Sequence, residues 1–142
     1  MIVEQMMSKT VVTVELDDSL KAVKEIFDNV SFHHLLVIDH GKLCGVISDR
    51  DLLKAISPNV GAISETYKDK ATLDKKVHQI MTRNPTTLFS ASGIYDAIDI
   101  FNSHAISCIP VVDKENVPVG ILSWRDILKV IGANHNKSSG KK

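Results

Sequence analysis

The chain has 142 residues, enough for one ordinary domain or for two small repeats that share a core. Hydrophobic residues make up 44% and charged residues 24%, proportions typical of a globular protein, which excludes wholesale disorder. Seventeen Lys and Arg balance seventeen Asp and Glu, so the formal net charge is zero. This balance argues against a general nucleic-acid binder, although a local basic patch remains open.

Targeting and redox signals are absent from the sequence. No apolar run approaches the roughly 20 residues that span a bilayer, and the first residues do not open a signal peptide. The two cysteines, Cys44 and Cys108, lie far apart in apolar runs and are typical of reduced, buried side chains. The sequence predicts a soluble cytoplasmic protein with no membrane contact.

The first predicted elements follow one another over residues 11–56. A β-branched run predicts a strand at Val11–Val14. Asp17, Asp18 and Ser19 supply helix-cap chemistry before a helical apolar stripe of Leu20, Val23, Ile26 and Phe27. Two apolar strands and a helix complete the series, at Leu35–Ile38, Leu43–Ile47 and Asp49–Ile56.

The same series returns in the second half of the chain, because the sequence is an internal duplication. A shift of 74 residues aligns the halves, and one extra residue near Glu115–Asn116 changes the shift to 75. Matching positions include Val3 with Val77, Met7 with Met81, Phe27 with Phe101, Val37 with Val111, and Gly45–Asp51 with Gly120–Asp126. The second copy therefore predicts strands at Thr86–Leu88, Ile109–Val112 and Val119–Leu122, an apolar helix stripe from Ile94 to Phe101, and a helix at Trp124–Ile131.

One β-α-β-β-α copy of about 50 residues buries too little surface to be comfortable alone, since domains of about 60 residues are already marginal. We therefore predict an α+β (mixed α/β) fold in which the two copies pack sheet against sheet with pseudo-two-fold symmetry. The expected boundaries are residues 1–57 for the first copy, 58–76 for a linker that includes the start of a helix, 77–132 for the second copy, and 133–142 for a disordered tail.

The most informative motif is Gly-h-h-Ser-x-Arg-Asp, where h is apolar, at Gly45–Asp51 and again at Gly120–Asp126. Taken singly, the Ser and the Asp are typical of a capping box at a helix start. A helix N-terminus also attracts anions, an arginine can grip a phosphate, and a carboxylate can accept bonds from ribose hydroxyls. Capping does not require the arginine, so repetition of all three residue types favours a binding site.

These segments, together with Ser107–Asp113, resemble a tandem pair of CBS domains (a Bateman module) over about residues 1–132. Length and linker are similar to those of small stand-alone bacterial CBS-pair proteins, some of them acetoin-utilisation-like. The resemblance implies a regulatory module that binds AMP, ADP or ATP between its repeats, with S-adenosylmethionine or NAD ranked below these. It also implies a homodimer that forms a four-repeat disc and acts on an unknown regulated protein, with no obligatory cofactor.

The resemblance also implies two sets of ligand-binding residues. The preferred set, in the second copy, is Asn84, Pro85, Thr86, Cys108, Ile109, Pro110, Ser123, Arg125 and Asp126. The first-copy set is Thr10, Val11, Val12, His34, Leu35, Leu36, Ser48, Arg50 and Asp51. The first copy departs from the family pattern at Leu36, where proline is frequent, and at Asp49. The extra charge of Asp49 is expected to weaken an anion site unless Lys9, His33 or another base offsets it.

Other functions have less support in the sequence. The six histidines show no metal-ligand spacing, and His33 and His34 are adjacent on a predicted strand, where they point to opposite faces. No P-loop and no marked nucleophile occurs, so we expect neither a metal site nor an enzyme. Two alternatives stay open: a ligand-independent dimeric scaffold with vestigial sites and, more weakly, nucleic-acid association through local Lys and Arg.

Overall fold

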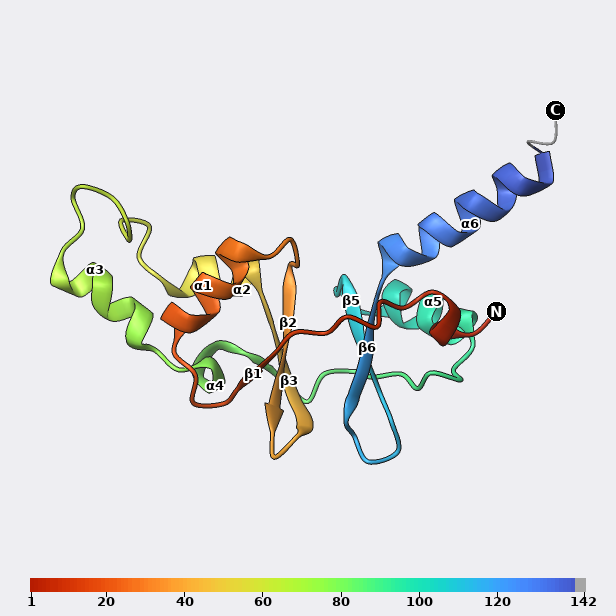
Figure 1. Cartoon of the computed structure of the whole chain (residues 1–142), viewed down its shortest axis with the longest axis horizontal. Coiled ribbons are helices and arrows are strands. Elements are labelled where there is room, and N and C mark those ends of the chain that lie inside the picture. Colours follow the sequence, from red (N-terminus) through yellow and green to blue (C-terminus); the bar gives the residue numbers. More distant parts are fainter. Residues whose placement is uncertain (140–142) are drawn as a thin grey trace. The chain divides into compact units, whose positions relative to one another are not determined.

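Figure 1 shows the computed structural model of the chain, which describes residues 1–139. The final three residues of the expected tail lie outside the described residues. The chain divides into two compact units. The first-copy unit is Val12–Pro85, and the second-copy unit combines Met1–Val11 with the chain from Thr86 onward.

The first-copy unit is built on a four-stranded sheet in the order β1-β2-β3-β4. Strand β1 runs parallel to β2, and the other pairs are antiparallel. The sheet and its two main helices comprise β1 (Thr13–Glu15), α1 (Leu20–Asn29), β2 (His34–Asp39), β3 (Lys42–Ser48), α2 (Asp49–Ala55) and β4 (Thr82–Arg83). The predicted mixed α/β class and the order of elements in this copy are confirmed.

Local chemistry explains where α1 begins and which face it buries. Ser19 Oγ accepts a 3.2 Å hydrogen bond from the Ala22 N–H, as the cap residues predicted. Leu20 and Val23 are fully buried, and they pack with residues of β2 and β3 in one apolar core. That core fixes the helix against the sheet.

The linker is only partly irregular. Residues 57–66 contain no helix or strand, and α3 (Tyr67–Ala71) and a 3₁₀ turn, η2 (Thr72–Asp74), follow. Ser57 Oγ donates a 2.6 Å hydrogen bond to Asp69 Oδ1, so the start of the linker is tied to α3. This bond and those from Thr66 hold the pKa of Asp69 below its ordinary value.

The second-copy unit is built on a two-stranded antiparallel hairpin, β5 (Cys108–Val112) with β6 (Pro118–Ser123). Its helices are η1 (Val3–Gln5), α5 (Ile94–Ser103) and α6 (Trp124–Ser139). The predicted strand at Thr86–Leu88 is replaced by a single parallel bridge from Leu88 to Val111. In the first copy the Leu36 N–H donates to the Val12 carbonyl. Pro110, at the position of Leu36, has no N–H to make that bond, which explains the shorter ladder.

Each unit is completed by the segment that precedes the other copy in sequence. Val3 and Met6 lie in the core of the second-copy unit, whereas Val77 and Met81 lie in the core of the first-copy unit. Helix α4 (Val77–Ile80) and β4 thus complete the first-copy unit, and residues 1–8 complete the second-copy unit in the same way. The predicted copies at 1–57 and 77–132 are repeats in the sequence, whereas each compact unit includes the segment that precedes the other copy.

The exchanged segments lie against one glycine in each unit. A Cβ added to Gly120 would lie 2.5 Å from Met7 Sδ and 2.9 Å from the Ser8 carbonyl oxygen. A Cβ added to Gly45 would lie 2.6 Å from Met81 Sδ and 2.9 Å from the Thr82 carbonyl oxygen. Only glycine permits so close an approach, which gives the matching glycines of the repeated motif a packing role.

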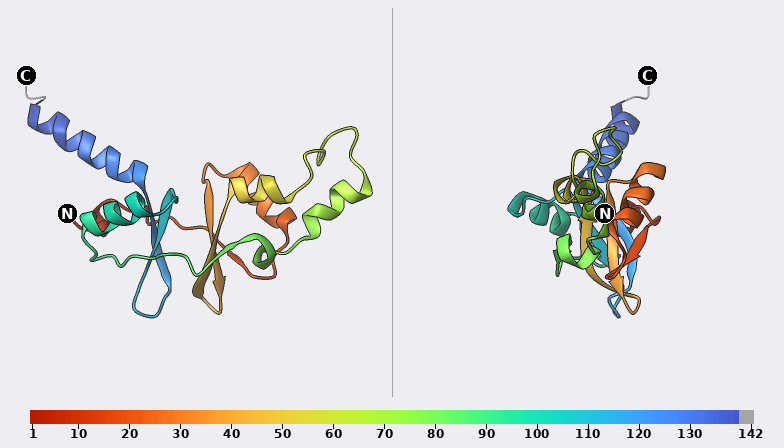
Figure 2. Two further views of the ribbon diagram at one scale, coloured as in Figure 1. Left: turned by 180° about the vertical axis from the view of Figure 1, so that it is seen from behind. Right: turned by 90° about the vertical axis from the view of Figure 1, so that its left-hand side faces the viewer.

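The chain end differs from the expectation of a disordered tail. Helix α6 continues from Trp124 to Ser139, about two turns beyond the Ile131 that ends the apolar stripe. Residues 132–137 are exposed along it. Figure 2 shows this helix from two further directions. Since residues 132–137 are exposed, hydrophobic periodicity could not have predicted this part of the helix.

Candidate functional site

The two copies of the motif place matching residues at the N-termini of α2 and α6. Ser48 N–H donates to Asp51 Oδ2 at 2.9 Å, and Asp51 N–H donates to Ser48 Oγ at 3.0 Å. The corresponding bonds between Ser123 and Asp126 measure 2.9 and 3.1 Å. Both Ser–Asp pairs therefore form reciprocal capping boxes, the structural role that the pattern predicts.

The arginines between these residues have no capping role. Arg50 and Arg125 are exposed at the first turn of each helix. Arg125 stacks over the Trp124 ring, with its guanidinium carbon 5.8 Å from the ring centroid. In each box only Oδ2 of the aspartate is engaged, so within residues 1–139 the other oxygen of Asp51 and of Asp126 accepts no hydrogen bond.

The first helical residue distinguishes the two copies. In the first copy it is Asp49, whose Oδ2 lies 2.8 Å from His33 Nδ1 and whose N–H donates to the His33 carbonyl. In the second copy it is Trp124, 45% exposed. At the first helical residue, the first copy therefore has a carboxylate paired with a histidine where the second copy has an aromatic ring, and an arginine follows in both copies.

The predicted strand residues lie beside these helix starts. In the first-copy unit His34 pairs with Ser48, and in the second-copy unit Cys108 pairs with Ser123. Burial lowers the pKa of His34, partly offset by Asp49 and Asp51, and burial raises the pKa of the Cys108 thiol to about 12. The next two residues of each strand are buried, so a ligand would meet mainly their backbone: Leu35, Leu36, Ile109 and Pro110.

The structure brings together most of each predicted set, but not all of it. In the first-copy unit, the Val12 carbonyl accepts from the Leu36 N–H, beside the strand pair that carries His34 and Ser48. In the second-copy unit, Thr86 belongs with β5 and the start of α6. The remaining members belong to the opposite unit from their set: Thr10, Val11, Asn84 and Pro85. A cleft that joins them stays a prediction, as does the sheet-to-sheet packing of the copies.

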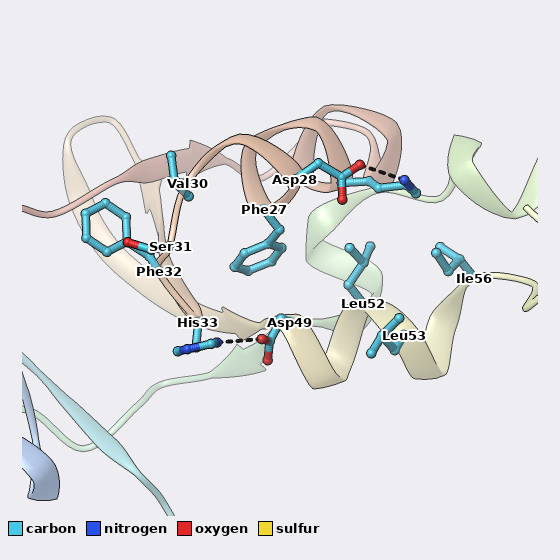
Figure 3. Close-up of a pocket in the computed structure, with 11 residues that line it drawn as sticks. Phe27, Asp28, Val30, Ser31, Phe32, His33, Asp49, Leu52, Leu53 and Ile56 are labelled. Carbon is cyan, nitrogen blue, oxygen red and sulfur yellow. Dashed lines mark hydrogen bonds and ion pairs between the residues drawn. The ribbon is translucent and has the colours of Figure 1, made fainter. Parts of the chain in front are cut away.

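The first-copy unit also contains a pocket that sequence reasoning missed (Figure 3). Its volume is about 260 Å³, and it lies between α1, the segment before β2, and α2. Phe27, Leu52 and Ile56 line it, and Asp49 and His33 lie at its rim. The helical stripes contain these apolar residues, but a stripe does not reveal whether the packing behind it leaves a space.

Other sites are not found among the described residues. Over residues 1–139, no three His, Cys, Asp or Glu side chains gather as metal ligands would. In the same part of the chain no helix combines the length and the hydrophobicity needed to cross a membrane.

The comparison with protein families matches both repeats. The CBS domain profile matches residues 3–58 and again residues 77–133. The chain belongs to the CBS domain family. A CBS domain-containing protein of Dictyostelium discoideum is 33% identical over 132 residues, which cover 92% of this chain and 90% of that protein. In other relatives the match covers only part of the protein. The uncharacterized protein MJ1232 of Methanocaldococcus jannaschii is 32% identical over 123 residues, which cover 37% of its length.

Solved CBS-pair structures have the same fold. The CBS domain pair of protein MJ0100, in complex with 5′-methylthioadenosine and S-adenosyl-L-methionine, is 29% identical with a TM-score of 0.75, over 94% of this chain and 98% of that one. CBSX2 in complex with AMP is 26% identical with a TM-score of 0.77, over the same shares. A putative acetoin utilization protein from Vibrio cholerae, 24% identical with a TM-score of 0.75 over 100% and 98% of the two chains, agrees in fold. The predicted family is confirmed.

Proposed function

We propose that this CBS pair is a regulatory module that binds an adenine nucleotide and alters how it meets a partner protein. The observation that carries the proposal is the repeated set of serine, arginine and aspartate at the N-termini of α2 and α6. The similar structures of the MJ0100 pair and of CBSX2 contain adenosine-based ligands, which supports AMP, ADP or ATP and keeps S-adenosylmethionine as a further candidate.

Each residue has a chemical role in this proposal. The open Oδ1 of Asp126 accepts from the two adjacent ribose hydroxyls, while Oδ2 stays in the capping box. Arg125 is exposed and lies one residue before it, where its guanidinium reaches a phosphate. Helix α6 adds the positive end of its dipole, since 16 helical residues follow in line.

We assign the stronger site to the second copy. At the first helical residue of the first copy, Asp49 places a negative charge where a phosphate would lie, and its pairing with His33 occupies that position. At the matching place the second copy has Trp124, which carries no charge and is held by Arg125. Repulsion between the Asp49 carboxylate and the phosphate weakens binding to the first copy.

Regulation then follows from differential binding. A ligand changes the arrangement of the two units only if it binds one arrangement more tightly than another, and a partner that prefers that arrangement senses the ligand. The proposal includes a homodimer as the assembly that meets the partner, a non-catalytic role, and the cytoplasm as location. The two cysteines are free thiols in the described chain, which supports a reducing compartment.

A second function, a ligand-independent dimeric scaffold, is favoured by one observation. The capping boxes account for the serine and the aspartate of both copies without any ligand. In that case the sites are vestigial, and the arginines are surface residues.

Calorimetry with AMP, ADP, ATP, S-adenosylmethionine and NAD separates the two functions. The sensor binds at least one of them below millimolar concentration, and Asp126→Ala weakens that binding by about 1–3 kcal/mol. Arg125→Ala weakens the binding of phosphate-bearing ligands. It does not lower the stability of the protein, because Arg125 has no hydrogen bond to lose within the described residues. Lys129→Ala, exposed on the same helix, is the matched control. If no compound binds, or if Asp126→Ala lowers stability but not affinity, the scaffold is the correct function.

A further inference from the structure

The start of α2 carries a charge that the start of α6 lacks. Residues 49–51 supply two carboxylates and one guanidinium, whereas residues 124–126 supply one carboxylate and one guanidinium. The duplication matches these residues one to one, so the carboxylate of Asp49 is the difference in charge between two otherwise equivalent helix starts. A ligand that carries a charge of its own should therefore distinguish the two sites.

The Asp49 carboxylate is only partly engaged by its neighbours. Its Oδ2 lies 2.8 Å from His33 Nδ1 (Figure 3), and its Oδ1 accepts no hydrogen bond within residues 1–139. In the same part of the chain Arg50 forms no ion pair or hydrogen bond, so it does not pair with Asp49. The side chain of Asp49 is 44% exposed, which leaves the open oxygen accessible to a ligand.

The charge of Asp49 acts on the strand residue that belongs to the proposed first-copy site. His34 pairs with Ser48, directly beside the start of α2. Burial lowers the pKa of His34, and Asp49 opposes this lowering more strongly than Asp51 does, while His33 adds to it. Because Asp51 is the proposed ribose-binding residue, a ligand held by it would lie within electrostatic reach of Asp49 as well.

The matching residues of the second copy present no such extra charge. Trp124 is uncharged, and the Arg125 guanidinium lies over its ring. Cys108, the counterpart of His34, is neutral because burial raises the pKa of its thiol to about 12. Among residues 107, 108 and 123–126, Asp126 carries the one negative charge, and Arg125 balances it.

We propose that Asp49 makes the first-copy site selective for adenosine ligands without a phosphate group, with preference for a positively charged substituent at the ribose 5′ carbon. Asp51 accepts from the ribose hydroxyls through its open Oδ1, as Asp126 does in the second copy. The 5′ substituent then lies toward the first helical residue, where Asp49 attracts a sulfonium and repels a phosphate. The inference rests on the proposed function and adds that the two sites of one chain take adenosine ligands of opposite charge.

Three ligands test the selectivity of the first-copy site by calorimetry. The neutral 5′-methylthioadenosine and its S-methyl sulfonium have nearly the same size and differ by one positive charge, and AMP carries the phosphate. In an Asp126→Ala background, which weakens the second-copy site, the sulfonium should bind most tightly, the thioether less tightly and AMP least. The dissociation constants of the sulfonium and AMP should differ by about tenfold or more.

Asp49→Asn removes the charge and keeps the size of the side chain. In the same background it should weaken the sulfonium about fivefold and strengthen AMP about fivefold, the effect of one unit charge at about 4 Å in water. The neutral thioether should change little, which controls for damage to the fold. His33→Asn keeps a hydrogen-bond donor for Asp49 and cannot be positively charged, so the order of the three ligands should persist. If His33→Asn abolishes the order and Asp49→Asn does not, the assignment to Asp49 is wrong.

The reciprocal test places the first-copy charge in the second copy. Trp124→Asp and Trp124→Asn both remove the indole, but only Trp124→Asp adds a carboxylate. In an Asp51→Ala background, AMP should bind Trp124→Asp about fivefold more weakly than Trp124→Asn, and the sulfonium should bind it about fivefold more tightly. Equal affinities of the two variants for both ligands would mean that charge at the first helical residue does not select the ligand.

The same measurements separate this inference from the proposed function. If AMP and the sulfonium bind the first-copy site equally and Asp49→Asn changes neither, nucleotide binding stands and the selectivity is overturned. If none of the three ligands binds the wild-type chain below millimolar concentration, the proposed function fails and the inference fails with it.

Discussion

The two units keep the same helix start and differ around it. In both, a serine and an aspartate form a reciprocal capping box at the end of the central hairpin. The first-copy unit adds strands at both edges of its hairpin, whereas the second-copy unit has only isolated bridges there. What is common to the units is the local chemistry of a helix N-terminus, and what differs is the surface around it.

That difference shows which residues at the helix start can vary between the copies without loss of the capping box. The capping residues have a structural role in both copies, so their repetition alone says little about ligands. The first helical residue has no such role, and it is Asp49 in one copy and Trp124 in the other. Proline at position 110 shortens the second-copy sheet, because the bond made by the Leu36 N–H has no equivalent. Tests that compare matched positions therefore separate structure from function.

The largest effect is expected where the exchanged segments meet the glycines. Gly120→Ala and Gly45→Ala should each destabilise the protein by about 1–3 kcal/mol, because the new Cβ meets a backbone oxygen at 2.9 Å that cannot move away alone. Thermal unfolding measures both. In Gly120→Ala the displaced segment is residues 1–11, which cross from the first copy to the second-copy unit, so faster proteolysis within this segment should accompany the loss.

Gly132→Ala is the control for these variants. Gly132 lies in α6 with nothing within 4 Å of an added Cβ, so alanine should be neutral or stabilise the helix by up to about 1 kcal/mol. If Gly120→Ala behaved like Gly132→Ala, the close approach of Met7 and Ser8 would not exist in solution.

A smaller effect is expected at the residue that distinguishes the two proposed sites. In an Asp126→Ala background, Asp49→Asn should strengthen nucleotide binding by the first copy by about 1 kcal/mol, since two unit charges 4 Å apart in water interact by about that amount. Calorimetry measures the change. Glu25→Gln, an exposed charge on α1 of the same unit, is the matched control. Equal gains from both variants would mean that net charge, and not the position of Asp49, limits the first-copy site.

Sequence reasoning predicted most local elements because their signals are local. The apolar stripe from Leu20 to Phe27 and the cap at Ser19 are both present in α1, and the box at Ser48 forms as its spacing indicates. The exchange of leading segments could not be predicted. Val3 and Val77 are matching residues, so either assignment to the two cores satisfies the same apolar pattern.

Each candidate site likewise contains residues whose proximity the sequence predicts and residues whose proximity it does not predict. The Ser, Arg and Asp of each motif lie on one helix turn, so their proximity follows from the sequence alone. Asn84 and Pro85, by contrast, belong to a different unit from Ser123, and their role in one site stays a prediction. The pocket beside Phe27 and Leu52 arises from packing between two helices, which no single stretch of sequence encodes.

The smallest effect concerns acid stability, and it follows from a matched pair of residues. His34 and Cys108 occupy the same strand position, but only His34 can gain a proton near neutral pH. Burial lowers the pKa of His34 in the folded protein, against opposing effects of Asp49 and Asp51 and with a further lowering by His33. The unfolded chain therefore binds the proton more readily than the folded chain. Stability is fully present above the unfolded value of about 6.5 and falls as the pH decreases from there toward the lowered folded pKa.

His34→Cys places the second-copy residue in the first copy and should flatten this loss between pH 7.5 and pH 5.5 in denaturant unfolding. Cys108 contributes nothing in that range, because its pKa of about 12 keeps the thiol neutral. The carboxyl of Asp69, whose pKa is lowered from 3.8, acts only at more acidic pH. The reciprocal Cys108→His should add an acid-dependent loss to the second-copy unit. If the wild-type chain and His34→Cys lose stability equally as the pH falls, the burial of His34 does not control the acid response. The side chain at this strand position would then differ between the copies without changing how stability depends on pH.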